Sequence, residues 1–138
     1  MEVTTNSKEE TQKIASDFAK TLKPGNIVAL NGELGAGKTV FVSAVAKTLG
    51  IKRNITSPTF IFAKSYTAGT LTFHHLDLYR AKDIRELEAL ALDEIFSSEA
   101  IVMIEWAERI QNYLPKKRID VSITKEDENK RRISITRN

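Results

Sequence analysis

A glycine-rich segment of this chain carries the residues best suited to chemistry. Residues 32–39 read Gly-Glu-Leu-Gly-Ala-Gly-Lys-Thr, so that a first glycine is followed by four variable positions and then by Gly-Lys-Thr. This is the spacing of a phosphate-binding loop, in which backbone N–H groups surround a polyphosphate, a lysine reaches the outer phosphates and a hydroxyl binds Mg²⁺. The three glycines are expected to provide positive φ angles and close backbone approach. Lys38 and Thr39 are therefore candidates for contact with phosphate and metal.

Two acids follow β-rich runs further along the chain. Asp77 comes after residues 70–76, and Glu105 ends the apolar run that starts at residue 100. Strands of an α/β nucleotide-binding sheet end at a common edge, so Asp77 has the usual position of a Mg²⁺-associated or water-orienting carboxylate. Glu105 resembles the acid of a Walker B strand, which binds Mg²⁺ directly or through water. An acid after a strand could instead face solvent, and the phosphate-binding loop is what favours a role at the site.

The turn Ser57-Pro58-Thr59 holds two hydroxyls on a stiff backbone, because proline fixes its own φ and keeps the preceding residue extended. Thr59 is a candidate to sense the γ-phosphate or Mg²⁺, as switch loops do. An ordinary turn explains the composition equally well. His74 and His75 are adjacent, so on a strand they would point to opposite faces and could not chelate one ion.

The periodicity of the first half predicts the elements that hold the loop. Residues 27–31 form an apolar run typical of a buried strand, and an apolar helical repeat follows the loop up to Gly50. Before them, Ser7 and Glu10 have the spacing of a capping box at a helix start. The loop is therefore expected between a strand and the positive end of a helix dipole, which favours a bound anion.

The second half predicts a hairpin, two helices and two further strands. The expected segments are a hairpin over 59–66 and 70–76 with Phe60, Phe62 and Tyr66 on one face, a helix over 83–91 capped by Asp83, a short helix around Leu92, Ile95 and Phe96, and antiparallel strands over 119–123 and 133–135. Together these patterns predict an α/β fold in one domain over residues 1–138. Its sheet is P-loop NTPase-like, mixed and mostly parallel, flanked by helices and extended by antiparallel hairpins.

Composition narrows the class of protein. The 138 residues are enough for one domain with a core, and the formal charge of +3 is mild for a dedicated nucleic-acid binder. Residues 115–138 hold eight Lys/Arg and four Asp/Glu, a net of +4 (8 − 4) that leaves −1 for the rest. Within them, Lys130-Arg131-Arg132 is either a solvated rim or a patch for nucleotide or RNA. The chain has no cysteine, no apolar run of membrane-spanning length and no signal-peptide layout, so we expect a cytoplasmic protein without membrane contact.

Four motifs occurring together resemble the bacterial TsaE (YjeE) family, and their order fits over nearly the whole chain. They are the loop at 32–39, Ser57-Pro58-Thr59, His75-Leu76-Asp77-Leu78-Tyr79-Arg80 and Ile104-Glu105-Trp106. That family is the ATPase component of tRNA threonylcarbamoyladenosine biosynthesis. The resemblance implies a Mg²⁺-dependent ATP hydrolase that is weak alone and stimulated by its partners. It would turn ATP into ADP to reset the complex of the TsaD and TsaB proteins, which make and transfer the threonylcarbamoyl group, and would meet tRNA indirectly through that complex.

The resemblance also implies roles for individual residues. Gly35, Ala36, Gly37, Lys38, Thr39 and Val40 would cradle the phosphates, Thr39 and Glu105 hold Mg²⁺, Thr59 act as the switch-like threonine, Asp77 serve hydrolysis, Trp106 lie beside the nucleotide, and Lys8 and the neighbourhood of Asn129 approach the adenine. Two positions depart from the family pattern. Val40 stands where many members have a second threonine, and Glu33 where many have aspartate. Val40 keeps its backbone N–H and loses only a hydroxyl contact.

Two other classes of function compete with this one. A small-molecule P-loop kinase would need a second substrate pocket and a lid with several arginines, and the only candidate lid, residues 78–90, has Arg80 and Arg85 alone. No glycine lies near them to anchor either one at the phosphates. An RNA-binding accessory module is favoured by the basic tail, but that tail lacks aromatic residues for base stacking. Without a clear arginine finger, an ATPase of this sequence is expected to be slow by itself.

Overall fold

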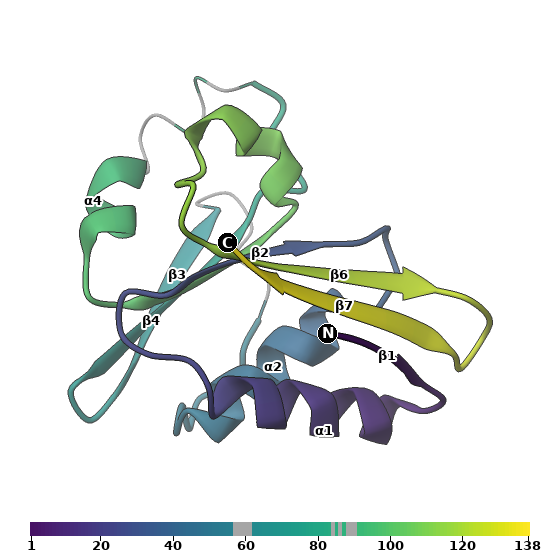
Figure 1. Ribbon diagram of the computed structural model, residues 1–138. Helices are drawn as coiled ribbons and strands as arrows, with labels where there is room; N and C mark the ends of the chain where they lie inside the picture. Colours follow the sequence, from purple (N-terminus) through teal and green to yellow (C-terminus); the bar gives the residue numbers. More distant parts are fainter. Residues whose placement is uncertain (57–61, 84, 86, 88–90) are drawn as a thin grey trace.

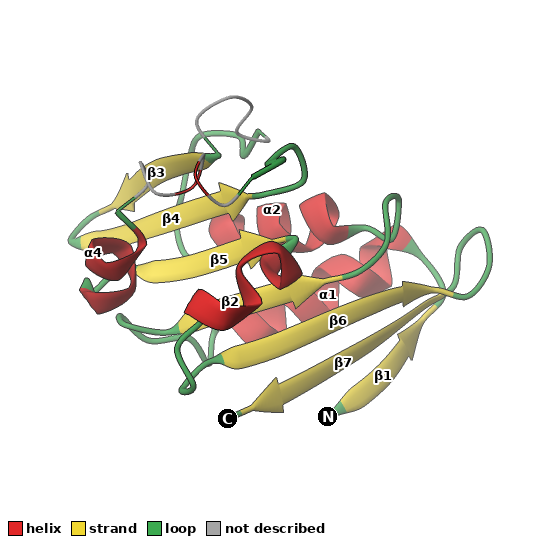
Figure 2. Ribbon diagram, turned by 90° about the horizontal axis from the view of Figure 1, so that it is seen from above, coloured by secondary structure: helices red, strands yellow, loops and turns green. Residues whose placement is uncertain are grey.

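One mixed sheet lies between two layers of helices (Figures 1 and 2). The computed structural model describes residues 1–56, 62–83, 85, 87 and 91–138, and over these it has seven strands. The strands are β1 (Glu2–Thr5), β2 (Ile27–Asn31), β3 (Ala63–Ala68), β4 (Leu71–Asp77), β5 (Ile101–Glu105), β6 (Ile119–Lys125) and β7 (Arg131–Arg137). The helices are α1 (Lys8–Ala19), α2 (Lys38–Thr48), α4 (Leu92–Ser97) and the 3-10 segment η1 (Ala107–Tyr113).

The strand order is β1-β7-β6-β2-β5-β4-β3. The four central strands β6, β2, β5 and β4 run parallel, and the hairpins β6–β7 and β3–β4 extend the sheet with antiparallel pairs on both sides. This arrangement confirms the predicted fold class. In the register, Glu105 is opposite Leu30 of β2 on one side and opposite Asp77 of β4 on the other. The two acids therefore end neighbouring strands, next to the strand that leads into the glycine-rich loop.

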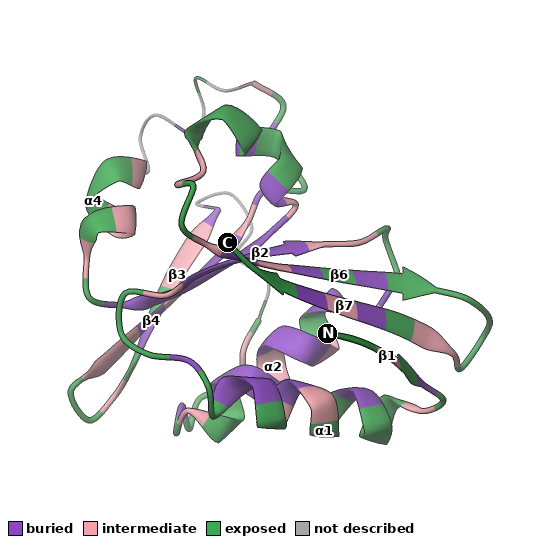
Figure 3. Ribbon diagram, in the orientation of Figure 1, coloured by how far each residue is buried: buried purple, intermediate pink, exposed green. Residues whose placement is uncertain are grey.

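The two faces of the sheet have separate cores. Helices α1 and α2 pack on one face, where the rings of Phe18 and Phe41 lie 5.8 Å apart between centroids. On the other face, Leu76, Ile104 and Ile110 belong to a second cluster beneath η1. Figure 3 shows both cores as purple central strands and purple inner sides of the helices. Strands buried on both faces explain the continuous apolar runs in the sequence of β2 and β5.

The start of α1 has the Ser7 half of the predicted capping box. The Ser7 hydroxyl accepts a hydrogen bond from the backbone N–H of Glu10 at 3.1 Å. The Glu10 carboxylate in turn accepts the N–H of Asn6 at 3.3 Å, one residue before the position expected for a capping box. Glu9 and Glu10 also place negative charge at the positive end of the helix dipole.

Several features differ from the sequence predictions or lie outside the described residues. Strand β1 was not predicted, because four residues with one aliphatic side chain carry no β periodicity; it forms by pairing with β7. The expectation that Phe62 and Tyr66 share one face is wrong. Phe62 precedes β3 with φ of 59°, which turns its side chain into the opposite core from that of Tyr66. The third member of that predicted face, Phe60, lies outside the described residues, as does most of the predicted 83–91 helix.

None of the helices in the described part of the chain is long and apolar enough to cross a membrane.

Candidate functional site

A cavity of about 370 Å³ lies at the carboxyl ends of the central strands, beside the glycine-rich loop. Eight of the residues singled out in the sequence line it: Gly35, Gly37, Lys38, Thr39, Val40, Asp77, Glu105 and Trp106. Tyr79 and Arg80 line it as well. The fold therefore brings the loop and both acids to one hollow, as expected for strands that end at a common edge. Thr59 lies outside the described residues, so its place relative to this cavity is a prediction from sequence.

Side chains are disfavoured at the glycine positions of the loop for two different physical reasons. Gly35 and Gly37 adopt φ of 82° and 103°, which side chains on L residues disfavour. Gly32 does not have a positive φ and shows the other property expected of these glycines, close backbone approach. A Cβ at Gly32 would lie 2.6 Å from the carbonyl oxygen of Ile123 on β6. Gly32 is thus required for close packing of the loop on the neighbouring strand.

The start of α2 is left open toward the cavity. Its N-cap is Gly37, no side chain accepts a hydrogen bond there, and its first turn contains no acid. The first backbone N–H groups of any α-helix have no partner within the helix. With neither a capping oxygen nor a carboxylate nearby, those of α2 remain available to an anion in the cavity, together with the positive end of the helix dipole.

Lys38, the first residue of α2, is buried and folded back on its own loop. Its ammonium donates hydrogen bonds to the carbonyl oxygens of Gly32 and Glu33, the latter at 3.2 Å. The same Nζ lies 3.9 Å from the ring centroid of Trp106. Burial lowers the pKa of Lys38, and the negative charges of Glu105 and other nearby acids oppose that shift. The lysine is held close to the place where a phosphate would lie.

Trp106 is positioned by an unusual backbone angle directly after β5. Its φ is 59°, and its ring lies 5.0 Å from that of Tyr79 at an interplanar angle of 39°. The Trp106 ring therefore contacts both the Tyr79 ring and the Lys38 ammonium, and all three residues line the cavity. Tyr79 was not predicted as a site residue. The only signal for it was its place in the segment that follows Asp77.

The two acids are held in different ways. Glu105 is buried, and its Oε2 lies 2.6 Å from Nε2 of His75, which is completely buried. Asp77 accepts the backbone N–H of Tyr79 at 3.1 Å on Oδ1. Burial raises the pKa of Asp77, the Tyr79 amide opposes that shift, and the charge of Glu105 adds to it. Each acid therefore has one oxygen held by a neighbour, but Glu105 is buried whereas Asp77 is partly exposed.

The paired histidines point to opposite faces, as predicted. His74 lies with its Nδ1 2.7 Å from the Ser65 hydroxyl, while His75 reaches Glu105 in the core. The role of His75 as the partner of the acid was missed. His75 is separated from Glu105 by 30 positions, and only the parallel pairing of β4 with β5 brings them together.

An arginine that the sequence left unanchored does reach the cavity. Arg80 lines it, although no glycine in its segment predicted this. The anchor is Arg109, whose guanidinium donates to the carbonyl oxygens of Ala81 at 3.1 Å and Tyr79 at 3.3 Å. Arg85 instead binds the carboxylate of Asp83 at 2.8 Å. Among the described arginines of the predicted lid, Arg80 is the one at the cavity.

A second cavity, of about 240 Å³, lies on the other side of the loop. It contains Lys8 and Asn129 and shares Gly35, Gly37 and Val40 with the first, while Ala36 belongs to this second cavity. The two residues predicted near an adenine are therefore brought beside the loop from opposite ends of the chain. Whether either contacts a base stays a prediction.

The basic segment at 130–132 contacts the glycine-rich loop and the turn between β6 and β7. Nε of Arg131 donates to the carbonyl oxygen of Ala36 in the loop at 2.9 Å, and its Nη1 donates to the backbone carbonyl oxygen of Asp127 at 3.0 Å. Lys130 and Arg132 both pair with Glu126, at 3.7 and 2.6 Å. Arg131 is therefore not part of a solvated rim, because its guanidinium supports the loop backbone. Contact of this segment with nucleotide or RNA stays a prediction.

Comparison with known proteins identifies relatives over almost the full length. The sequence model of the family described as "Threonylcarbamoyl adenosine biosynthesis protein TsaE" matches residues 5–133. A protein of Bacillus subtilis (strain 168), named tRNA threonylcarbamoyladenosine biosynthesis protein TsaE, is 42% identical over 128 residues, which are 93% of this chain and 80% of the relative. A protein of the same name from Rickettsia bellii (strain RML369-C) is 44% identical over 132 residues, or 95% of this chain and 91% of the relative.

A solved structure supports the same relationship. The crystal structure of YdiB from Bacillus subtilis superposes with a TM-score of 0.82 at 36% sequence identity, covering 99% of this chain and 84% of that one.

Proposed function

This chain belongs to the TsaE family and so takes part in tRNA threonylcarbamoyladenosine biosynthesis, and we propose that its contribution is to bind ATP with Mg²⁺ and hydrolyse it to ADP. One observation carries this proposal. The uncapped start of α2 opens into the same cavity as two carboxylates from adjacent strands. An anion-binding helix end opposite metal-binding acids is the arrangement that phosphoryl transfer needs, because catalysis there is mainly positioning and charge stabilisation.

The residues present suit both groups. Open N–H groups, a helix dipole and the Lys38 ammonium fit a polyphosphate. The exposed hydroxyl of Thr39 and the carboxylate of Glu105 are oxygen ligands of the kind that Mg²⁺ prefers, and both line the cavity. Bound there, Mg²⁺ would supply the positive charge that stabilises negative charge developing on the phosphate oxygens. His75 would hold Glu105 in one orientation through its 2.6 Å contact.

The other residues of the cavity would complete the reaction site. Asp77 would orient the attacking water, since its carboxylate lies at the cavity and the Tyr79 amide fixes one of its oxygens. Lys38 would exchange its hydrogen bonds to the loop carbonyls for contacts to the outer phosphates. Trp106 would lie beside the nucleotide, Lys8 and Asn129 near the adenine, and Thr59 would respond to the γ-phosphate as a switch residue does.

We further propose that hydrolysis resets a complex of the TsaD and TsaB proteins and is slow without them. An arginine finger contributes about 10³ to 10⁵ in rate. Arg80 lines the cavity but is exposed. The hydrogen bonds from Arg109 hold the backbone on either side of Arg80 and do not hold the Arg80 guanidinium. Docking on the partners would drive Arg80 or a partner cation toward the phosphates. The same event would couple ATP turnover to the modification cycle.

The test uses the Asp77→Ala variant in the reconstituted modification system. We expect it to bind ATP and to associate with TsaD and TsaB, to support a single round of tRNA modification, and to fail in repeated rounds. The measurement is single- against multiple-turnover modification, with phosphate release followed in parallel. Many rounds at the parent rate would show that neither the role of Asp77 nor the reset is correct.

A further inference from the structure

The middle of the chain is free of acidic residues. From Leu34 to Leu76 there are 43 residues with five Lys or Arg and no Asp or Glu. Because the whole chain carries +3, the remainder carries −2 (3 − 5). One of the five cations, Lys38, belongs to the nucleotide site. The other four have no part in that site, and their charge is not balanced by any acid near them in sequence.

The fold gathers three of these cations at the far end of α2. Lys47, Lys52 and Arg53 are exposed and line a cavity of about 670 Å³ together with Ser43 and Asn54. Helix α2 begins at the phosphate-binding loop and has 11 residues, so at 1.5 Å per residue its two ends are about 16 Å apart. This basic cavity is therefore separate from the nucleotide cavity.

Its cations differ from three of the eight cations of the basic tail, which pair with carboxylates. In the tail, Arg118 pairs with Asp120 at 3.0 Å, and Lys130 and Arg132 pair with Glu126. Within the described part of the chain, no carboxylate pairs with Lys47, Lys52 or Arg53. The dipole at the end of α2 accounts for one cation, Lys47 in the last turn, but not for the two beyond the helix.

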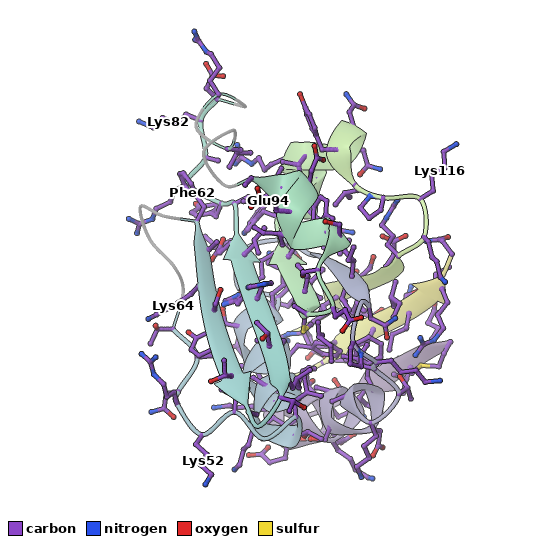
Figure 4. The ribbon with its side chains drawn as sticks, turned by 90° about the vertical axis from the view of Figure 1, so that its left-hand side faces the viewer. Lys52, Phe62, Lys64, Lys82, Glu94 and Lys116 are labelled. Atoms are coloured by element: carbon purple, nitrogen blue, oxygen red, sulfur yellow. The ribbon has the colours of Figure 1, made fainter. Side chains whose placement is uncertain are left out.

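The loop that carries these residues is tied to the edge strand β3. Arg53 lies over the ring of Tyr66 at 5.7 Å, and the Lys64 ammonium donates to the Thr56 hydroxyl at 3.0 Å. Figure 4 shows Lys52 and Lys64 projecting on the same margin of the molecule, with Lys116 on the opposite margin. The cations are thus presented by a supported loop along one side of the sheet.

We propose that Lys47, Lys52 and Arg53 form a binding surface for the phosphodiester backbone of RNA, directly on this chain. Ammonium and guanidinium groups around a hollow suit successive phosphates. The residues that line the cavity include no aromatic ring, so contact would be to the backbone and independent of base sequence. The choice of RNA over an acidic protein surface rests on the proposed function in tRNA modification. The proposal differs from the expectation that tRNA is met only through the partner complex.

The experiment measures binding of the full chain to an unmodified tRNA transcript and to an unrelated hairpin RNA, by fluorescence anisotropy at several salt concentrations and without nucleotide. The test variant is Lys52→Glu with Arg53→Glu. The matched control is Lys116→Glu with Lys117→Glu, which makes the same change in net charge at exposed positions on the other margin. We expect the test variant to lose roughly 30-fold in affinity for both RNAs at 0.1 M salt, with a shallower salt dependence, and the control to stay within about 3-fold of the parent.

Three outcomes would overturn the proposal. They are equal losses in both double variants, undetectable RNA binding by the parent, or unchanged RNA binding by a test variant that no longer associates with TsaD and TsaB. The last would assign the surface to an acidic protein partner. ATP binding and hydrolysis are measured on the same variants. Because Lys52 and Arg53 lie outside the nucleotide site, a failed RNA result with intact hydrolysis leaves the proposed function standing.

Discussion

The two long helices of this protein both begin with a lysine, yet their first turns are built in opposite ways. At α1, the Ser7 hydroxyl caps the Glu10 amide, and two glutamates lie in the first turn. At α2, Gly37 offers no capping side chain, and the first turn has no acid. Helix α1 therefore satisfies its own end, whereas α2 leaves its amides and its dipole uncompensated.

This contrast shows what an open helix end costs and why it is kept. With glycine at the N-cap, the missing capping side chain costs only roughly a few tenths of a kcal/mol. A missing acid in the first turn costs about 0.3–1 kcal/mol. The protein caps the start of α1 with its own side chains. It omits the cap at α2, where a phosphate would take the place of the missing oxygens. A helix start that lacks every usual capping device is thus a sign of an anion site, provided that a cavity adjoins it, as one does here.

The largest expected effect comes from exchanging the two leading lysines for alanine. Lys38→Ala should reduce ATP hydrolysis by on the order of 10²–10³ and weaken nucleotide binding, because the main cation at the transferred phosphate is lost. Lys8→Ala should weaken nucleotide affinity only a few-fold and leave the maximal rate close to the parent's, since Lys8 lies in the second cavity. Steady-state phosphate release by each variant is the measurement. Parent-like hydrolysis by Lys38→Ala would end the assignment of the loop.

The second prediction gives α2 the acid that α1 already has. Val40→Asp places a carboxylate in the first turn of α2, where Val40 borders both cavities. Attraction to the helix dipole should raise stability without nucleotide by about 0.3–1 kcal/mol, while repulsion of the phosphates lowers ATP affinity at least ~10-fold. Val40→Asn is the control, with a similar shape and no charge. An unchanged affinity in Val40→Asp by calorimetric titration would mean that phosphates do not approach this turn.

The third prediction concerns the cap of α1, which Ser7→Ala removes so that α1, like α2, has no capping side chain. Ser7→Ala should cost about 1 kcal/mol and lower Tm by about 3 °C, because the Glu10 amide loses its acceptor. Ser7→Asp keeps a capping oxygen and should melt near the parent temperature. Thermal unfolding without nucleotide provides the comparison. Equal Tm values for Ser7→Ala and the parent would show that the cap of α1 contributes nothing measurable.

The smallest effect concerns the acid that faces the open end. Burial raises the pKa of Asp77 above its ordinary value of 3.8, so the folded protein holds this proton more tightly than the unfolded chain does. The stability that the protonated Asp77 contributes is fully present below pH 3.8 and is lost as the pH rises through the pKa of Asp77 in the folded protein. At pH 7 the ionised carboxylate therefore destabilises the fold, and Asp77→Asn should raise Tm by about 1–2 °C. The gain should vanish below about pH 3.8. A gain that is independent of pH would contradict this origin.

The sequence by itself determined the features that depend on neighbouring residues. The glycine-rich turn at 32–39 between a strand and a helix, the N-cap at Ser7 and the acids at the ends of β4 and β5 were predicted correctly, because spacing and periodicity within one segment specify them. The mixed sheet with its hairpins followed from the same patterns and from the family resemblance. Local chemistry therefore located the glycine-rich loop and predicted the class of fold before any contact was known.

Only the tertiary structure decided which distant residues meet. His75 reaches Glu105 across 30 positions, and Arg131 supports Ala36 across 95. Lys8 and Asn129 come to the same cavity from opposite ends of the chain, and Gly32 is needed because β6 passes close to it. These contacts depend on the order of strands in the sheet, and periodicity shows that a segment is a strand without showing its neighbour. The physical reason is that hydrophobic burial is non-directional, so the pairing that aligns particular side chains is settled only when the whole sheet assembles.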